Sequence, residues 1–273
     1  MKKELGLFVL LIVLCCAVVG VEIWQQLHDG ATWSELTKPR FLTAINFSNL
    51  ATRIGLYGVF SLGLGLVIIT GGIDLSVGSM IALTGVILSI ALTEWKWGWV
   101  ASGMLVVAMP MALGWVHGAL ITRAKVQPFI VTLCGLMIYR SLARYIADDG
   151  TKGFGDAEGF KGFASLANGK MFGLPSPFVI LMMFSVILWF VLHRSVYGRY
   201  LFAVGRTEDA ARFSGINTRF VITATYVLMG ALTGMAGMLW AFYTNSISPS
   251  NHGNSFELYG IAAAVLGGCS LRG

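Results

Sequence analysis

Charged residues are scarce in this chain. Asp, Glu, Lys and Arg make up only 12% of its 273 residues, whereas soluble domains contain about 25%. Hydrophobic residues make up 56% of the chain, and they occur in blocks long enough to cross a hydrocarbon layer of about 30 Å. So few charges cannot cover the surface of a soluble core of this size. The composition therefore excludes a soluble globular domain.

Cysteine is also rare, and the common enzyme motifs are missing. The four cysteines show no spacing typical of a zinc site, a redox pair or a disulfide framework. The chain lacks a phosphate-binding loop, a HExxH or GxSxG motif and a paired-carboxylate arrangement. We therefore expect no enzymatic activity, no metal and no cofactor in this chain. Its net charge of +6 comes from short segments between apolar blocks, so we expect no nucleic-acid partner.

The apolar blocks predict an all-α fold, a polytopic transmembrane helical bundle with seven full spans and a partial eighth. The eighth block begins near Leu258 and runs only to Leu271. We interpret residues 1–273 as a single transmembrane domain, and its first block as a retained anchor, because no small-x-small cleavage site follows it. The seven full spans are expected at 5–21, 54–73, 75–93, 99–122, 128–146, 178–192 and 219–243.

The positions of Lys and Arg favour a cytoplasmic N-terminus. The long segments 22–53 and 147–177 then lie outside, where long loops count little in this rule. Arg140 and Arg144, toward the outer end of the fifth span, argue mildly against this orientation. The inside segments contain ten of the nineteen basic residues, namely Lys2, Lys3, Arg123, Lys125, Arg194, Arg199, Arg206, Arg212, Arg219 and Arg272.

Ionisable groups are nearly absent from the expected spans. Besides Arg140 and Arg144, only His117 lies deep in one, and we expect it to be a hydrogen-bonded packing residue. Ion-coupled carriers and proton pumps need buried carboxylates or cations along their pathway. This absence disfavours a secondary carrier, and the energy for transport would have to come from elsewhere.

Glycine and an acidic residue mark the connection between the second and third spans, where the sequence reads GGIDLSVGS over 71–79. The paired glycines break a helix, and the aspartate can cap the next one. Two interpretations stay open: a capped tight turn at the membrane surface, or a broken helix that faces the pathway or a partner. The residues of this broken-helix motif are Gly71, Gly72, Asp74, Ser76 and Gly78.

A second motif lies in the predicted cytoplasmic segment 198–218. Thr207 is a good N-cap, acidic residues follow in the first turn, and Arg212 suits the last turn. Gly215 can end the helix, so the sequence predicts a short helix over 207–215. The apolar residues Ala210, Ala211 and Phe213 beside these charges suit docking into a groove on a partner.

Three motifs together resemble the bacterial monosaccharide ABC importer permeases, the ribose, xylose and related sugar permeases, which are close to the autoinducer-2 permeases. They are GGIDLSVGS at 71–79, GRYLFAVGRTEDAARFSGI at 198–216 and ELYGIAAAVLGGCSLRG at 257–273. The resemblance covers essentially the whole chain. It implies a pore subunit of the cell inner membrane that pairs with a second permease subunit as a homo- or heterodimer. A cytoplasmic ATPase subunit and a periplasmic sugar-binding protein would complete the importer.

The resemblance also implies roles for particular residues. The segment 198–218 would be the coupling loop that docks on the ATPase, and the ATPase would hydrolyse ATP. This loop is related to the EAA-type coupling motif, with Asp209 where Glu is usual. Members of the family continue past this point with further spans, so we expect a C-terminally truncated chain. The expected coupling residues are Glu208, Asp209, Ala210, Ala211 and Gly215.

The resulting hypothesis is a permease subunit that passes a monosaccharide such as ribose into the cytoplasm. Three alternatives stay open. The first is the same architecture with another solute, such as autoinducer-2, a nucleoside or an amino acid. The second is a secondary carrier, which the empty interior disfavours. The third is a membrane scaffold or receptor without transport.

Overall fold

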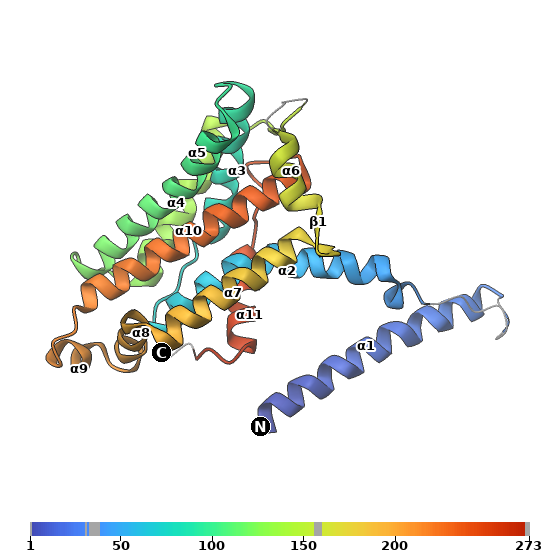
Figure 1. Cartoon of the computed structure of the whole chain (residues 1–273), viewed down its shortest axis with the longest axis horizontal. Helices are drawn as coiled ribbons and strands as arrows, with labels where there is room; N and C mark the ends of the chain where they lie inside the picture. The colour runs from blue at the N-terminus through green and yellow to red at the C-terminus, as the bar shows by residue number, and fades with distance from the viewer. Residues whose placement is uncertain (1, 31, 33–38, 156–159, 271–273) are drawn as a thin grey trace. The chain divides into compact units, whose positions relative to one another are not determined.

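The computed structural model describes residues 2–30, 32, 39–155 and 160–270, and the chain divides into two compact units, 1–52 and 53–273. The first unit contains α1 (Lys2–His28), the short 3-10 helix η1 (Arg40–Leu42) and the start of α2 (Ala44–Ile69). Helix α1 is continuous and apolar (Figure 1). Glu22 accepts a hydrogen bond from the Phe41 N–H at 3.1 Å, which ties η1 to α1.

The second unit is a bundle of helices with one small hairpin. Strands β1 (Lys170–Met171) and β2 (Leu174–Pro175) pair antiparallel, and the two residues between them, Phe172 and Gly173, both have positive φ, as a two-residue hairpin turn requires. The helices after α2 are α3 (Val77–Thr93), α4 (Trp99–Thr122), α5 (Pro128–Ile146), α6 (Phe160–Asn168), α7 (Ser176–Arg194), α8 (Val196–Arg206), α9 (Glu208–Phe213), α10 (Thr218–Thr244) and α11 (Phe256–Leu266).

The expected all-α, multi-pass bundle is confirmed, but the count of seven full spans is not. Among the described residues, six helices are long and apolar enough to cross a membrane: α1, α2, α4, α5, α7 and α10. Helix α3 coincides with the expected third span, but it has only 17 residues. Helix α11, at the expected partial eighth span, has 11 residues.

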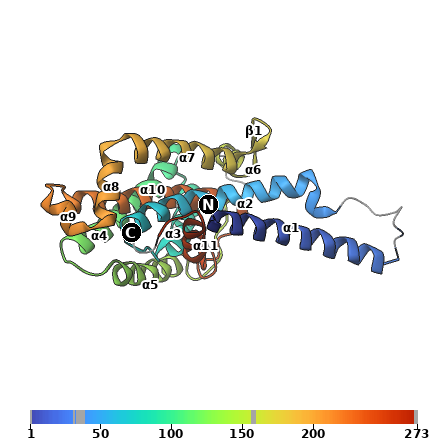
Figure 2. The same cartoon turned by 90° about the horizontal axis from the view of Figure 1, so that it is seen from below.

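Helix α10 is the central element of the second unit. Figure 2 shows α7 and α5 on opposite sides of it. Its glycines meet the backbone of α4, because a β-carbon on Gly230 would collide with the carbonyl of Pro110 and one on Gly234 would lie 2.5 Å from the carbonyl of Val106. Small residues allow such close backbone contact in lipid, where van der Waals packing must hold helices together.

The described residues of the segment 147–177 contain more structure than a plain loop. Its first part pairs with the chain after α10, through a bridge between Lys152 and Ile247. The Ser89 hydroxyl of α3 donates to the Gly153 carbonyl at 2.7 Å, and buried Phe154 stacks on Phe242 with ring centres 4.7 Å apart. Helix α6, the hairpin and this bridge were not predicted from the sequence.

Candidate functional site

The first feature of the site is the break between α2 and α3. Helix α2 ends at Ile69, and Gly71 adopts the left-handed conformation with φ +78°. The N–H groups of Gly71 and Gly72 still bond to the carbonyls of Ile68 and Val67, at 2.9 and 3.0 Å. Residues 72–76 then run without helical structure until Val77 begins α3. The prediction that the two glycines end the helix is confirmed.

Asp74 lies inside the protein, with only 2% of its surface exposed. Its Oδ1 atom accepts hydrogen bonds from the N–H and the hydroxyl of Ser76, at 2.8 and 2.6 Å. Ser76, rather than Asp74, is the residue that precedes the first turn of α3. Asp74 therefore fixes the turn that leads into the helix, and its burial favours the broken-helix interpretation over a turn at the membrane surface.

Polar groups from three other helices surround the break. The Ile73 carbonyl accepts hydrogen bonds from the hydroxyls of Tyr226 on α10 and Thr132 on α5, both at 3.3 Å. Beside them, Tyr139 Oη and His117 Nε2 lie 2.8 Å apart, which confirms the prediction that His117 is a hydrogen-bonded packing residue. The Ile73 carbonyl is not part of a helix, so without these two hydroxyls it would be an unsatisfied hydrogen-bond acceptor in a low-dielectric interior.

The sequence analysis counted ionisable residues only within the expected spans, and it therefore missed the buried carboxylate of Asp74. Asp74 falls between two apolar blocks in the sequence, yet the structure buries it beside His117, Tyr139 and Tyr226, which all feel its charge. The interior is therefore not free of acids. The low charge of the spans alone no longer argues against ion coupling, and the assignment of the driving force has to come from other observations.

The second feature is the predicted coupling segment, which contains two helices, α8 and α9. Only the second was predicted. Thr207 precedes α9 as expected, but its hydroxyl donates to the Arg206 carbonyl at 2.6 Å instead of capping the helix. Gly215 has φ +83°, and the following N–H of Ile216 bonds back to the Ala211 carbonyl at 3.1 Å, so the predicted glycine stop is confirmed.

Exposure divides the residues of the predicted helix 207–215, which include the five expected coupling residues, into two groups. Phe213, an apolar side chain, is 84% exposed, whereas Ala211 is only 4% exposed and packs in the core. Ala211 therefore anchors α9 on this chain and does not offer surface to a partner. The residues with exposed side chains or backbone are Glu208, Asp209, Ala210, Arg212, Ser214 and Gly215.

Helix α8 is fixed to the bundle at two points. The Tyr197 hydroxyl lies 2.8 Å from the Thr225 hydroxyl on α10, and burial raises the pKa of the Tyr197 phenol, so this group stays a neutral hydrogen-bonding partner. At the other end, Gly205 approaches the last turn of α2 so closely that a β-carbon would collide with the Ile69 carbonyl. The coupling segment therefore rests directly on the end of α2.

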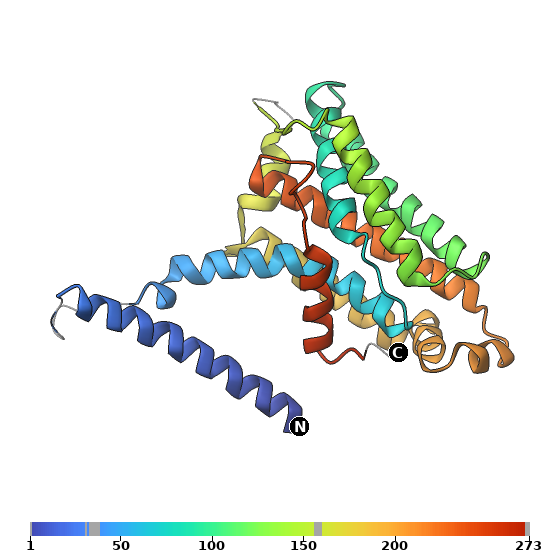
Figure 3. The ribbon, with the colours of Figure 1, turned by 180° about the vertical axis from the view of Figure 1, so that it is seen from behind.

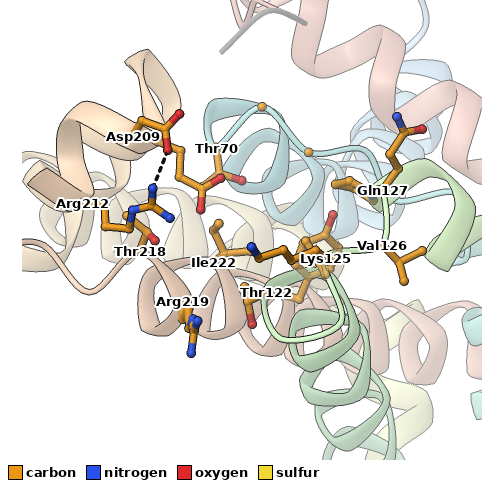
Figure 4. Close-up of a pocket in the computed structure, with 16 residues that line it drawn as sticks. Thr70, Thr122, Lys125, Val126, Gln127, Asp209, Arg212, Thr218, Arg219 and Ile222 are labelled. Carbon is orange, nitrogen blue, oxygen red and sulfur yellow. Dashed lines mark hydrogen bonds and ion pairs between the residues drawn. The ribbon is translucent and has the colours of Figure 1, made fainter.

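The break and the coupling helix line one cavity of about 490 Å³. Figure 4 shows Asp209 and Arg212, joined by an ion pair of 3.0 Å, on one side, and Lys125 and Gln127 of the α4–α5 connection on the other. The two motifs are thus brought together, which spacing in the sequence could not show. The lining residues are Thr70, Gly71, Gly72, Ile121, Thr122, Lys125, Val126, Gln127, Pro128, Glu208, Asp209, Arg212, Thr218, Arg219, Ile222 and Tyr226.

The known proteins that this chain resembles are all transport permeases. The model of the family described as "Branched-chain amino acid transport system / permease component" matches residues 46–273. Ribose import permease protein RbsC of Bacillus subtilis is 36% identical over 247 residues, covering 87% of this chain and 73% of the relative. Its counterpart in Escherichia coli K12 is 34% identical over 235 residues, covering 86% and 73%.

A third relative, galactofuranose transporter permease protein YtfT of Escherichia coli K12, is 32% identical over 272 residues, covering 97% of this chain and 73% of the relative. No solved structure matches the chain. The family comprises transport permeases rather than enzymes, and the helices described above agree with it. The chain belongs to this family of ATP-binding-cassette importer permeases and is a multi-pass protein of the bacterial inner membrane.

Proposed function

We propose that this chain is the membrane-spanning subunit of an importer that moves a monosaccharide from the periplasm into the cytoplasm. The observation that carries the proposal is the identity of 36% to a ribose import permease over 87% of the chain. Other relatives are named as permeases for fructose and for D-allose. The description of the family model names branched-chain amino acids, but the relatives named here are sugar permeases, which favours a sugar as cargo.

A separate cytoplasmic ATPase would supply the energy, a periplasmic binding protein would deliver the sugar, and a second permease subunit would complete the pore. Helix α9 is the expected docking point for the ATPase, since it exposes the apolar ring of Phe213 beside charged side chains. An exposed aromatic residue of this kind is a common anchor in protein interfaces.

The contacts of α8 suggest how movement would travel. A displacement of α9 would move α8, which precedes it with only Thr207 between them, and Gly205 would press on the end of α2 at Ile69. The break after Ile69 would let α2 and α3 tilt relative to each other, as the two permease subunits alternate between outward-open and inward-open states. The mechanism thus needs the helix break and the coupling helix to lie together, as they do around the cavity.

Transport by reconstituted protein tests the proposal. Proteoliposomes would contain the permease, its ATPase and, outside, the binding protein loaded with labelled D-ribose, D-fructose or D-allose. We expect uptake of at least one of these sugars. This uptake should require ATP in the lumen of the liposomes and should be unaffected by proton and sodium ionophores. Uptake driven by an ion gradient without the ATPase would contradict the importer assignment and support a secondary carrier.

A matched pair of phenylalanines tests the docking of α9. Phe213→Ala should weaken co-purification of the ATPase by about tenfold or more, because a central aromatic anchor contributes about 2 kcal/mol or more. Phe172, at the hairpin turn, is 93% exposed, and Phe172→Ala should leave co-purification unchanged. Equal behaviour of the two variants would refute docking through α9.

A further inference from the structure

The connection between α10 and α11, residues 245–255, turns back into the bundle along α3. A β-carbon on Gly85 would lie 3.2 Å from the side chain of Ile247, and one on Gly78 would collide with the Gly253 carbonyl. Gly85 and Gly78 are seven residues apart on α3, which is about 10 Å at the rise of an α-helix. From Ile247 to Gly253 the chain therefore follows α3 inward, toward the break. Residues 245–255 thus form a re-entrant segment.

The re-entrant segment reaches membrane depth. Glu94 directly follows α3 and pairs with Lys152 at 2.7 Å, which marks the expected outer end of the helix. Gly78 lies fifteen residues before the last residue of α3, and hence about 22 Å from that end. Figure 3 shows the chain passing from the end of α10 to α11 in the middle of the bundle. Since a hydrocarbon core is about 30 Å thick, the contact of Gly253 with Gly78 lies inside it.

Arg140 of α5 holds the re-entrant segment in place. Its Nη1 atom donates to the carbonyls of Pro249 and His252, at 3.0 and 2.6 Å. Within the segment, the N–H groups of Asn251 and His252 bond to the Ser248 carbonyl, at 3.1 and 2.8 Å. Irregular backbone at membrane depth needs such partners, because the hydrocarbon offers none. A charged side chain within a span is costly, so its use here indicates that the position of the segment matters for function.

This chain leaves part of the re-entrant segment uncovered. His252 is only 8% exposed, yet its Nε2 atom has no hydrogen-bond partner among the described residues. Such an atom is rare in native proteins and points to water or a ligand beside it. Other side chains of the segment are open to the outside. The exposed residues within 248–255, all of them polar and uncharged, are Ser250, Asn251 and Asn254.

Polar groups on irregular backbone cannot face lipid. Within the hydrocarbon region such backbone is found only where protein covers it or where it lines a water-filled cavity. Interfaces between the subunits of stable dimers are more apolar than the rest of the surface. An exposed side made only of serine and asparagine therefore favours a water-filled passage over a subunit contact.

We propose that the re-entrant segment lines the passage for the monosaccharide and that Asn251 and Asn254 contact the sugar as it crosses the membrane. This inference rests on the proposed function. Each side-chain amide provides donors and an acceptor, which match the hydroxyls of a neutral sugar without the cost of a charged group. Ligand sites commonly fix their ligand through a few placed polar groups of this kind. Arg140 is a positioning residue, which acts through the carbonyls of the segment.

Thiol labelling tests whether the segment lines a water-filled passage. Asn251→Cys and Asn254→Cys would each be made in the full complex after replacement of the four native cysteines by alanine. In proteoliposomes both should react with a charged methanethiosulfonate reagent, and excess D-ribose, but not sucrose, should slow the reaction by about twofold or more as the sugar occupies the passage. Val186, 52% exposed on the apolar helix α7, is the control, and Val186→Cys should not react because lipid excludes the charged reagent.

ATP-dependent uptake tests the contact with the sugar. Asn251→Ala and Asn254→Ala should each lower uptake of D-ribose by about threefold to tenfold, as expected for the loss of a neutral hydrogen bond. The preference for D-ribose over 2-deoxy-D-ribose should narrow in at least one of them, and a purely structural role would not change this preference. Asn49, exposed on α2, is the matched control, and Asn49→Ala should transport like the wild type. Co-purification of the ATPase should stay intact in all three variants.

Several results would overturn the proposal. Cysteines at 251 and 254 that stay as unreactive as Val186→Cys would show that lipid or the second subunit covers the segment. Unchanged uptake and preference in both alanine variants, or loss of uptake together with loss of the ATPase, would remove the sugar contact. If the wild-type complex shows no ATP-dependent uptake, the proposed function fails and the sugar contact fails with it. Labelling requires no transport, so it still decides in that case whether the segment lines a water-filled passage.

Discussion

The break after α2 and the segment 207–215 around α9 contain the same kinds of residue, but they lie in opposite environments. Each contains a glycine in the left-handed conformation, Gly71 with φ +78° and Gly215 with φ +83°, and each places an acidic residue close to the start of a short helix. Asp74 is 2% exposed, whereas Phe213, two residues before Gly215, is 84% exposed.

The comparison shows that a glycine and an acidic residue near the start of a helix do not by themselves reveal the role of a segment. At the break, the carboxylate of Asp74 is held by Ser76 and surrounded by residues of three helices. At α9, the carboxylate of Asp209 pairs only with Arg212 on the same short helix. A change at the break should therefore spread through the bundle, while a change at α9 should affect docking and leave the fold intact.

Gly205 connects the two regions, so its substitution should have the largest effect. In Gly205→Ala the new β-carbon collides with the Ile69 carbonyl, and backbone cannot move aside as a flexible side chain can. Overpacking of this kind costs about 1–3 kcal/mol, and α8 would have to leave the end of α2. We expect a lower melting temperature in detergent and a loss of ATP-dependent uptake of more than about tenfold.

Gly98→Ala is the matched control. A β-carbon at Gly98 meets nothing within 4 Å, and Gly98 has an ordinary φ of −61°. The control should keep the melting temperature and the uptake of the wild type. If Gly205→Ala behaves like Gly98→Ala, then α8 does not press on α2, and the mechanical connection between the two regions is wrong.

A pair of substitutions at Asp74 should have the second-largest effect. Asp74→Ala leaves the buried N–H of Ser76 without its acceptor, which costs about 1–3 kcal/mol, whereas Asp74→Asn keeps an oxygen in the same place. We expect Asp74→Asn to keep most of the thermal stability and of the uptake that Asp74→Ala loses. Asp209→Ala, which removes an exposed ion pair, should leave the melting temperature nearly unchanged.

The outcome at Asp74 also distinguishes two roles of its carboxylate. If Asp74→Asn folds like the wild type but transports as poorly as Asp74→Ala, the negative charge itself is needed, and the break would be more than a hinge. If Asp209→Ala destabilises the chain as strongly as Asp74→Ala, the contrast between a buried and an exposed acidic side chain does not hold.

Much of the fold was predictable because its signals are local. Apolar length placed α4 and α5 at 99–122 and 128–146, the bounds that the structure has, and glycine with a preceding charge pattern predicted the end of α9 at Gly215. Helix α8 was missed because its residues were read as part of a loop, although Ser195 caps it through the Gly198 N–H at 3.0 Å.

The site was less predictable because it depends on contacts between distant residues. The sequence indicated both the break at Gly71 and the coupling helix at Glu208, but not that they line one cavity. The burial of Asp74 follows from Thr132, Tyr139 and Tyr226 on helices far along the chain, and a count of charges within apolar blocks cannot register it.

Removal of the exposed ion pair at the end of α5 should have the smallest effect. It tests whether an exposed acidic residue contributes little to the stability of this bundle. Arg144 donates a hydrogen bond to Asp149 at 2.8 Å, and this bond holds the pKa of the Asp149 carboxyl below its ordinary value of 3.8. Because the folded pKa is lowered, the contribution to stability is present above the unfolded pKa and is lost as the pH falls through the folded value.

Asp149→Asn should therefore lower the melting temperature at pH 7 by about 1 °C or less, since water and salt screen an exposed pair, and the small difference should vanish at a pH below the folded pKa. Melting curves of the wild type and Asp149→Asn at pH 7 and at acidic pH, each at low and high salt, measure this. A difference of several degrees that survives acid or salt would show that an exposed charged pair can support this bundle as strongly as the buried carboxylate of Asp74. The division between the two environments would then no longer explain the roles of the two motifs.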